Sequence, residues 1–398
     1  MVGALDGVLV LDLSRILAGP TATQLLGDLG ATVIKIENPK TGGDDTRSWG
    51  PPYAETPDGN SDLSAYFMAA NRNKYSVAAD LTTEAGQELV RSIAVYADVV
   101  IENYKPGGLE KYGLDHATLC AERPELVYCS ISGFGQTGPE RDRAGYDLMA
   151  QGFGGIMSLT GAPEGDPMKV GVGIADVMCG MYATIGMLAA LRHRDATGEG
   201  QHIDLALVDS QMAWLVNEGT NYLASGQEPV RRGNAHPNIV PYNVFATKDG
   251  HIILAVGNDR QFRAFCEAVK RPDLAQVAEF ATNPSRIANR DAVNAAVVEA
   301  LAGYNSEEIL RVLQDSGVPS GPIHSVGQAL HSAQAQYRGA VVDVPDSQTV
   351  AGQVQLLGNP LKFSKTPVEV RRAPPRFGAD TGDLAQLLDG FRRKSARN

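Results

Sequence analysis

The motifs of several large enzyme classes are missing from this chain. The first apolar segment is not followed by the glycine fingerprint GxGxxG, which disfavours a dehydrogenase on a doubly wound sheet. The sequence also has no GxxxxGK[ST] phosphate loop, no HExxH zinc motif and no serine in a GxSxG setting. The chain therefore carries the signature of none of these classes.

Cysteine is scarce, and the four cysteines form no CxxC pair and have no histidine at metal-ligand spacing. The seven histidines are scattered, so we expect no metal site. Thiols without a disulfide pattern fit a reducing compartment. We expect a cytoplasmic bacterial protein, or an organellar one if a transit peptide has been removed. The cysteines are Cys120, Cys129, Cys179 and Cys266.

No hydrophobic run stands out as a membrane span, so we expect no membrane association. The N-terminus lacks a basic start, a long apolar stretch and a small-residue cleavage site, which predicts a first strand rather than a signal peptide. The net charge of −11 argues against nucleic-acid binding. A local cluster of cations could still hold an anionic ligand.

The composition is that of an ordinary globular protein with a large core, since 43% of the 398 residues are hydrophobic and 20% are charged. Apolar runs typical of buried strands alternate with helix-like segments, which predicts an α/β fold with a mostly parallel sheet flanked by helices. The predicted strands are 8–13, 33–37, 75–79, 98–101, 125–131 and 202–205. The predicted helices are 20–30, 83–96, 176–194 and 208–224.

A polar, turn-rich stretch at 225–240 predicts a domain boundary. Beyond it we expect a β-hairpin over 242–256 and helices at 259–270 and 286–315. A proline-rich tail at 359–378 should be extended and return to cover the first domain. The predicted domains are residues 1–224, the N-terminal part of a large domain; 225–325, a small domain; and 326–398, the return to the large domain.

The helix predicted over 176–194 carries small residues at every third position. These are Gly180, Ala183, Gly186 and Ala189. Small residues at that spacing let another backbone approach closely, so a second element is expected against this face.

Four Gly- or Asn-rich segments stand at predicted strand ends, and in an open α/β sheet ligands bind beyond the carboxyl ends of the strands. These loops could meet on one ligand, and an adenine nucleotide with phosphates would suit the cations near them. For any single loop, an ordinary turn with solvated cations is the simpler interpretation. The segments are 16–20, 71–74, 102–107 and 132–138, and the cations are Lys35, Arg72, Lys74, Lys105 and Lys111.

Asp176 is the only charged residue between Lys169 and Arg192. Its simplest interpretation is a helix N-cap, a position where Asp is favoured. A carboxylate at a helix N-terminus in apolar, Gly-rich surroundings would also stay ionised and accessible. A carboxylate nucleophile needs both properties, so the two roles are compatible.

With these residues in place, the chain resembles the class III coenzyme A-transferases, the family that includes formyl-CoA transferase and carnitine CoA-transferase. The matching segments keep the family order from the start of the chain almost to its end. They are LDGV at 5–8 with DL at 12–13, AGP at 18–20, LGDLGA at 26–31 with VIKIE at 33–37, NRNK at 71–74, VIENY at 100–104 with PG at 106–107, GFGQTGP at 133–139, GYD at 145–147, Asp176, KDG at 248–250, GVP at 317–319 with GP at 321–322, and PP at 374–375.

The resemblance implies a large doubly wound domain built from both chain ends, with a smaller α+β domain between them. It further implies a homodimer of two interlocked chains, in which the active site lies between the large domain of one chain and the small domain of the other.

The resemblance also implies a mechanism. Asp176 matches the catalytic aspartate, which forms an aspartyl–acyl anhydride and then an aspartyl–CoA thioester. Coenzyme A would be a substrate, the other substrates would be an acyl-CoA and a carboxylic acid, and no permanently bound cofactor or metal is implied. The residues expected to bind coenzyme A are Arg15, Ile16, Leu17, Ala18, Asn71, Arg72, Lys74, Asn103, Tyr104, Lys111, Ser132 and Phe134.

Differences from formyl-CoA transferase reduce the range of substrates that we expect. Leu17 replaces a glutamine and Phe134 replaces a tyrosine, which argues against formyl or oxalyl groups. The segments 44–52 and 71–74, together with His236 and the segment VPY at 240–242, look most like the branch that uses succinyl-CoA and dicarboxylates such as glutarate or hydroxymethylglutarate.

A second carboxylate on the substrate would need a cation, and arginine offers bidentate geometry. Arg47 and His236 are the expected substrate residues, with Arg72 as a further candidate. For Arg47 the alternative is a weak, exposed ion pair with Asp44 or Asp45.

Tetrahedral intermediates need N–H donors for the developing oxyanion, and some family members use a Gly-rich segment of the small domain. This chain has no glycine run there, so segments 232–236 and 257–258 are the candidates. The closest rival function is the α-methylacyl-CoA racemase of the same fold. That branch has a histidine base where this chain has Tyr146, whose reference pKa of ~10 makes a poor base. A coenzyme A-binding protein without catalysis would lack the aspartate at 176.

Overall fold

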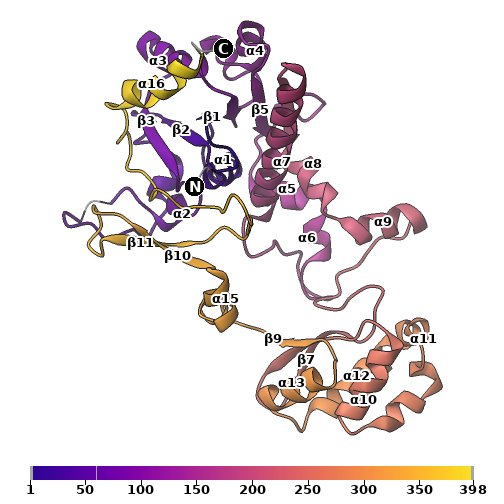
Figure 1. Cartoon of the computed structure of the whole chain (residues 1–398). Coiled ribbons are helices and arrows are strands. Elements are labelled where there is room, and N and C mark those ends of the chain that lie inside the picture. Colours follow the sequence, from indigo (N-terminus) through magenta and orange to yellow (C-terminus); the bar gives the residue numbers. More distant parts are fainter. Residues whose placement is uncertain (1–2, 60, 396–398) are drawn as a thin grey trace. The chain divides into compact units, whose positions relative to one another are not determined.

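The computed structural model describes residues 3–59 and 61–395 and divides into two compact units, which are treated separately (Figure 1). The large unit takes the chain up to 157, then 169–227, and the chain from 333 onward. The small unit takes 158–168 and 228–332. The predicted boundaries at 225 and 326 differ from these, and 158–168 was assigned to the wrong part, because Gly233 N–H donates to Gly161 O (3.1 Å) and Arg231 donates to Gly165 O (2.8 Å).

The described part of the large unit is built on a parallel sheet of six strands in the order β3-β2-β1-β4-β5-β6 (Figure 1). All neighbouring pairs run parallel, which confirms the predicted α/β class. The runs over β1 and β4 are buried at every position, as expected for strands covered on both faces. The strands are β1 (Leu9–Asp12), β2 (Thr32–Glu37), β3 (Lys74–Ala78), β4 (Val99–Glu102), β5 (Val127–Ser132) and β6 (Gln201–Ala206).

Helices cover both faces of this sheet. One core contains Leu9 and Leu11 with side chains of α3 (Glu84–Ala94), α4 (His116–Glu122) and α16 (Leu384–Ser395). The other contains Val10 with side chains of α1 (Ala18–Asp28) and α7 (Ile174–Thr197). Successive strand residues point to opposite faces, so β1 contributes alternately to the two cores. The sheet is therefore doubly wound.

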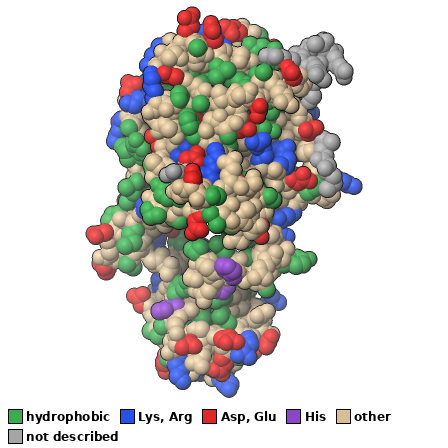
Figure 2. Space-filling view, turned by 90° about the vertical axis from the view of Figure 1, so that its left-hand side faces the viewer, with side chains coloured by type: hydrophobic (Ala, Val, Ile, Leu, Met, Phe, Trp, Pro, Cys, Tyr) green, Lys and Arg blue, Asp and Glu red, His purple; other side chains and the backbone are tan. Residues whose placement is uncertain are grey.

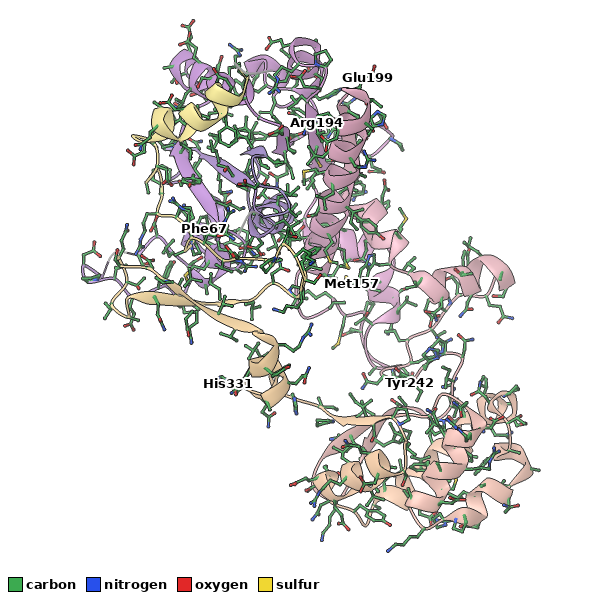
Figure 3. The ribbon with its side chains drawn as sticks, in the orientation of Figure 1. Phe67, Met157, Arg194, Glu199, Tyr242 and His331 are labelled. Atoms are coloured by element: carbon green, nitrogen blue, oxygen red, sulfur yellow. The ribbon has the colours of Figure 1, made fainter. Side chains whose placement is uncertain are left out.

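Part of the small-residue face of α7 packs against α1, as its spacing predicts, whereas Gly186 faces Ile203 of β6 and Ala189 is exposed. A Cβ atom at Gly180 would lie 2.8 Å from the carbonyl oxygen of Ala18, which is closer than a real Cβ can approach. At its other end, Arg194 (labelled in Figure 3) donates to Asp98 at 2.7 Å and ties the last turns of α7 to the start of β4.

The C-terminal segment returns to the large unit, as predicted. Residues 359–378, all described, form no helix or strand and lie against the end of α1, where Arg371 donates to Gly27 O at 2.7 Å. Farther on, the N–H groups of Ser76 and Ala78 donate to Asp380 and Thr381 (both 2.9 Å), so the tail covers the free edge of β3.

The remaining elements of the large unit are shorter. The helix predicted over 208–224 is two helices, because Val216 has a φ of 41° that continuous helix does not permit. These elements are η1 (Asp45–Ser48), α2 (Ala65–Met68), η2 (Glu110–Tyr112), α5 (Asp147–Phe153), α6 (Ile156–Leu159, which runs into the small unit), α8 (Leu207–Ala213), α9 (Val216–Ser225), α15 (Ala333–Arg338), β10 (Val341–Pro345) and β11 (Gln353–Leu357).

The small unit packs helices against an antiparallel sheet of β7, β8 and β9, which includes the predicted hairpin. The helix predicted over 286–315 is three helices that share one core with the sheet. The elements are β7 (Tyr242–Ala246), β8 (His251–Ala255), α10 (Asp259–Ala268), η3 (Pro272–Gln276), η4 (Ala278–Phe280), α11 (Asn283–Ala288), α12 (Arg290–Leu301), α13 (Ser306–Asp315), β9 (Ser320–Pro322) and α14 (Val326–Leu330).

Candidate active site

A cavity of about 470 Å³ opens in the large unit at the carboxyl ends of β1, β4 and β5. The strand order reverses between β1 and β4, and such a switch point is where open α/β sheets bind ligands. Three of the four predicted loops line this cavity. The lining residues are Arg15, Ile16, Leu17, Ala18, Asn103, Tyr104, Lys105, Pro106, Gly108, Lys111, Tyr112, Ile131, Ser132, Gly133, Arg143, Ala144, Gly145, Tyr146, Asp176 and Leu207.

The loops after β1 and β4 are clamped together across the switch point. Arg15 N–H donates to Asn103 Oδ1 at 3.0 Å, and Asn103 Nδ2 donates back to Arg15 O at 2.7 Å. Ile16 has a φ of 72° and donates its N–H to both carboxylate oxygens of the buried Asp44 at 3.2 Å. These bonds fix the backbone that forms one wall of the cavity.

Cations and aromatic rings share the rim of the cavity. Arg15, Lys105, Lys111 and Arg143 all contribute to its lining, which suits a ligand with phosphate groups. The guanidinium of Arg143 lies 5.0 Å from the ring centre of Phe134, so this arginine is stacked as well as charged. Phe134 therefore lies behind Arg143 rather than on the cavity wall itself.

Asp176 lies at the same cavity, as the third residue of α7. It is not the N-cap, which is Gly173, and the cap is supplied from another helix. Asp147, the first residue of α5, accepts from the N–H groups of Ala175 (2.8 Å) and Asp176 (3.4 Å) through one oxygen. Gln151 Nε2 donates to the other oxygen at 2.7 Å and holds this carboxylate in place.

The carboxyl group of Asp176 is poorly solvated. The residue is 9% exposed, and its burial, reinforced by the negative charge of Asp147, raises the pKa of Asp176 to about 7. At neutral pH the group is therefore only partly ionised in the free chain, although it lines the cavity. Desolvation outweighs the favourable position at a helix N-terminus.

The segment 71–74 does not reach the cavity, contrary to its predicted role in binding coenzyme A. It runs into β3, whose first residue is Lys74, and so lies at the amino end of an edge strand, and its side chains are buried. Arg72 forms a bidentate ion pair with Asp28 (2.9 and 2.5 Å), and Asn71 accepts from Lys74 Nζ at 2.9 Å. Their polar atoms are used inside the core.

Two predicted cations are also enclosed. Lys35 Nζ bonds to Asp44 at 2.8 Å with both side chains buried. Lys74 Nζ bonds to Asp12 at 3.2 Å, and burial lowers the pKa of Lys74 to about 8. Neither charge faces the cavity.

Arg47 has neither of its predicted roles. It is 4% exposed and bonds to both oxygens of Glu37 (2.8 and 2.6 Å) and to Asp62 (2.9 Å). Its guanidinium lies 3.8 Å above the ring of Phe67, which Figure 3 labels. The pair is buried and its partners are not Asp44 or Asp45, so both a substrate contact and an exposed ion pair are excluded in this conformation.

His236 lies in the small unit, where its ring packs 5.1 Å from that of Tyr242 (labelled in Figure 3). Its N–H donates to Tyr242 O, and the N–H groups of Gly233 and Ala235 are likewise bonded within the unit. Gly257 N–H donates to Gln261 Oε1 at 2.8 Å. Most of the proposed oxyanion donors are therefore occupied in this conformation.

Sequence reasoning missed several residues of the site. Tyr146 and Asp147 stood in a matched motif, but only the structure shows that Asp147 caps α7 beside Asp176. Nothing in the sequence singled out Arg143. In the described part of the chain, no group of three or more His, Cys, Asp or Glu residues is arranged to hold a metal ion.

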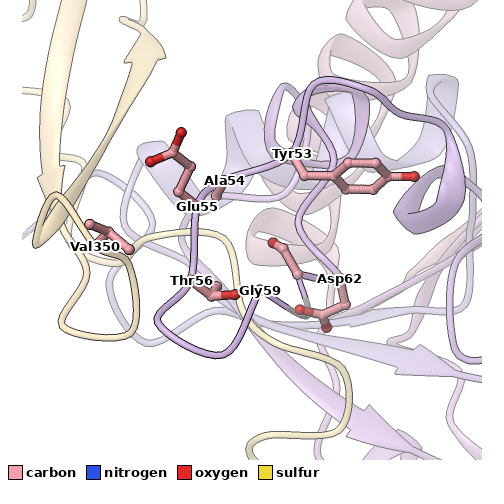
Figure 4. Close-up of a pocket in the computed structure, with 8 residues that line it drawn as sticks. Tyr53, Ala54, Glu55, Thr56, Gly59, Asp62 and Val350 are labelled. Atoms are coloured by element: carbon pink, nitrogen blue, oxygen red, sulfur yellow. The ribbon is translucent and has the colours of Figure 1, made fainter.

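A second hollow of about 730 Å³ shares no lining residue with the Asp176 cavity (Figure 4). It is lined by Tyr53, Ala54, Glu55, Thr56, Gly59, Ser61, Asp62 and Val350. Its charged lining residues are acidic, which does not suit an anionic ligand.

Helix α7 is more apolar than expected from the sequence, from which no membrane span was predicted. Within the described residues, α7 is the one helix long and apolar enough to cross a membrane, and 56% of its most apolar stretch is buried inside the protein. A core helix passes the same test, so this is weak evidence for a membrane span.

Comparison with known proteins gives a consistent result. Residues 5–381 match the model of the CoA-transferase family III. The chain is 46% identical to succinate–glutarate CoA-transferase of Agrobacterium fabrum, over 98% of this chain and 96% of that protein. It is 39% identical to succinyl-CoA:glutarate CoA-transferase of Homo sapiens, over 95% of this chain and 84% of that protein.

A solved structure of a CAIB/BAIF family protein from Brucella suis has the same fold, with a TM-score of 0.87. It is 46% identical and covers 98% of this chain and 100% of its own. Matches of this length and identity agree with the doubly wound sheet and the cavity at its switch point. The chain belongs to the CoA-transferase family III and is an enzyme that transfers coenzyme A.

Proposed function

We propose that this enzyme transfers coenzyme A from succinyl-CoA to a dicarboxylate, with glutarate as the preferred acceptor. The names of the similar proteins from Agrobacterium fabrum and Homo sapiens support the substrates. The observation that carries the proposal is the position of Asp176, a carboxyl group on the wall of a cavity rimmed by cations. A reacting thioester and the phosphates of its carrier could both be held there.

Asp176 is the proposed nucleophile. Its carboxylate attacks the thioester carbonyl of succinyl-CoA, coenzyme A leaves as the thiolate, and an aspartyl–succinyl anhydride forms. The thiolate attacks the aspartyl carbonyl, which releases succinate and gives an aspartyl–CoA thioester. Glutarate displaces the thiolate to form an aspartyl–glutaryl anhydride. The thiolate then attacks the glutaryl carbonyl, so that glutaryl-CoA leaves and the Asp176 carboxylate is restored.

The residues that line the cavity divide the work of binding coenzyme A. Arg15, Lys105 and Lys111 present charge to its phosphates, while Leu17 and Ala18 present apolar surface near Asp176. Asn103, Tyr104 and Ser132 keep their expected roles as lining residues of the loops after β4 and β5. We do not propose that Asn71, Arg72 and Lys74 bind coenzyme A, because their polar atoms are bonded inside the core.

The distal carboxylate of the dicarboxylate needs a cation, and Arg143 replaces Arg47 and Arg72 in that role. It lines the cavity together with Asp176, and its planar group is pre-oriented over Phe134. His236 keeps its proposed substrate role as a residue of the small unit.

We also propose that the functional form is an interlocked homodimer in the cytoplasm. Large apolar side chains are open to solvent in the single chain, including Ile185 (60%), Leu223 (83%) and Tyr337 (88%). Figure 2 shows hydrophobic side chains spread among charged ones on one face. A second chain could cover apolar side chains of this size, as aromatic and aliphatic residues are covered at the core of protein interfaces. Light scattering of the purified protein should give twice the chain mass of 42.3 kDa.

An exchange assay tests the function. The protein is incubated with succinyl-CoA and a panel of mono- and dicarboxylates, and new acyl-CoA species are followed by mass spectrometry. Glutaryl-CoA is the expected product, and Asp176→Asn should abolish it. Asp291→Asn, an exposed position in the small unit, is the matched control and should leave exchange intact.

A complete lack of exchange with every acid would contradict the transferase assignment for these substrates. The racemase alternative would then be examined by deuterium wash-in at the α-carbon of a 2-methylacyl-CoA. Tyr146 argues against that outcome, because it stands where the racemase branch has its histidine base.

A further inference from the structure

Glu102 is a buried acid directly behind the wall of the cavity. It is the last residue of β4 and is 6% exposed. Its carboxylate accepts from Tyr104 N–H at 2.7 Å and also from the side chain of Ser130 on the adjacent β5. Within the described part of the chain, no lysine, arginine or histidine forms an ion pair with it.

A chain of hydrogen bonds continues from Glu102 across the sheet. Ser130 Oγ lies 3.0 Å from His202 Nε2 on β6, and the ring of His202 stacks on that of His116 at 3.8 Å. Burial, followed by the neighbouring His116, lowers the pKa of His202 below its ordinary value, which favours the uncharged ring. A neutral His202 can donate to Ser130, which in turn donates to the ionised Glu102.

The residues that follow Glu102 form the cavity wall. Asn103 exchanges two hydrogen bonds with the backbone of Arg15, and Tyr104 lines the cavity while packing against the core of the large unit. The bond from Tyr104 N–H to Glu102 closes the turn through which the chain leaves β4. Without that acceptor, the N–H would be left without its partner and the turn could open.

We propose that Glu102 is a positioning residue for coenzyme A, which holds the turn at residues 103–105 in the conformation that lines the cavity and joins it to the loop of Arg15. The proposal rests on the proposed function, in that the cavity is taken to bind coenzyme A. Glu102 acts through Asn103 and Tyr104 and does not itself line the cavity.

The electrostatic surroundings make this turn sensitive to pH. Burial raises the pKa of Glu102 to about 7, although the hydrogen bonds from Ser130 and Tyr104 oppose that rise. The other titratable groups around it are Tyr104 on the same turn and Tyr128 and Cys129 on β5, whose pKa values are all raised by burial, so they stay neutral. The positive charge of Arg15 on the adjacent loop opposes the rise in the pKa of Tyr104.

The ionised carboxylate accepts from both donors, whereas the protonated acid gives up part of this capacity. Binding of coenzyme A should therefore tighten as the pH rises through about 7. Glutamine at this position keeps an oxygen for Tyr104 N–H but cannot ionise, so Glu102→Gln should remove this part of the pH dependence. Titration of coenzyme A itself is common to both proteins and cancels in their comparison.

The test compares Glu102→Ala, Glu102→Gln and a control by calorimetric binding of coenzyme A and by exchange kinetics from pH 6 to 8.5. The Ala variant should raise the Kd and the KM for succinyl-CoA by about tenfold, because a buried donor loses its acceptor, while kcat changes by less than about threefold. The Gln variant should restore Kd at pH 7 to within about threefold of wild type. Val99→Ala, a core truncation at the other end of β4, should lower stability without changing Kd.

Three results would overturn the proposal: an unchanged Kd in Glu102→Ala, a Gln variant as defective as the Ala variant, or a Val99→Ala variant with the same loss of affinity. Should Glu102→Ala fail to fold, the pH dependence of Kd in the Gln variant decides the matter alone. Failure of the proposed function gives a different pattern, because the wild-type protein itself would then neither bind coenzyme A nor exchange it.

Discussion

At the scale of single residues, the proposed site depends on two acids, Asp176 and Glu102, which ionise less readily because they are buried. Asp176 and Glu102 both have a pKa raised to about 7, and both lie within hydrogen-bonded surroundings at the ends of elements. Sequence inspection can find an isolated Asp in an apolar stretch, as it did for Asp176. It cannot find the desolvation, since that depends on what folds over the residue.

The pH dependence of turnover follows from Asp176. Its carboxylate is the proposed nucleophile and its pKa in the free protein is about 7, so kcat/KM for succinyl-CoA should fall as the pH drops below 7 and level off above it. Asp147→Asn removes the neighbouring negative charge but keeps an oxygen for Ala175 N–H, so the acid limb should move to lower pH. An unchanged limb in a folded Asp147→Asn protein would count against this origin of the shift.

Stability should respond to Glu102 with the opposite sign. Its pKa in the fold is above the ordinary value of 4.5, so the folded state holds the proton more tightly than the unfolded chain. That contribution is complete below pH 4.5 and is lost as the pH rises through about 7. Glu102→Gln should therefore gain melting temperature relative to wild type at pH 8 and not at pH 5, as measured by calorimetry.

Arg72 provides a test of the corrected assignment. Arg72→Met breaks a buried pair with Asp28 and should cost about 3–5 kcal/mol in the free energy of unfolding, because a carboxylate is left buried without its cation. The KM for succinyl-CoA, measured at a temperature where the variant is folded, should stay within about twofold of wild type. A large change in KM at full folding would restore Arg72 to the binding set.

At the scale of elements, the six strands of the large sheet, the hairpin of the small unit and the close contact of α7 at Gly180 could be predicted, because hydrophobic period and residue size indicate them directly. The helix breaks were not predicted, namely the positive φ of Val216 and the junctions between α11, α12 and α13. The segment 71–74 was wrongly predicted to bind coenzyme A. Its residues match the family motif, but only the pairing of β3 with β2 shows that the segment lies at the amino end of an edge strand.

Because α7 contacts α1 closely at only one of two glycines, substitutions at Gly180 and Gly186 should have different effects on stability. Gly180→Ala should destabilise the protein by about 1–3 kcal/mol, since its Cβ would meet the backbone of Ala18, a lining residue of the cavity. Gly186→Ala meets Ile203 at an ordinary 3.5 Å and should be neutral or gain ~0.5–1 kcal/mol from helix propensity. Equal effects in urea unfolding would refute close packing as the cause.

At the scale of the whole molecule, the large unit is assembled from distant parts of the chain while the small unit is almost continuous. The family resemblance and the extended tail predicted that both ends of the chain build the large unit. They did not predict that residues 158–168 belong to the small unit. A chain that ends at residue 358 should lose the large unit while the small unit persists, because the cover of α1 and β3 and the whole of α16 are removed. Proteolysis followed by mass spectrometry should then leave a fragment near 228–332.

Asp380 and Thr381, which cover the free edge of β3, are synthesised near the end of the chain, so this edge is covered late. A ribosome releases residues 228–332 well before the segment that seals β3, so the small unit can be complete while the sheet of the large unit still has an open edge and a bare face. Until the last helix leaves the exit tunnel, that nascent sheet is exposed to pairing with other chains, and molecular chaperones would be expected to act in this interval.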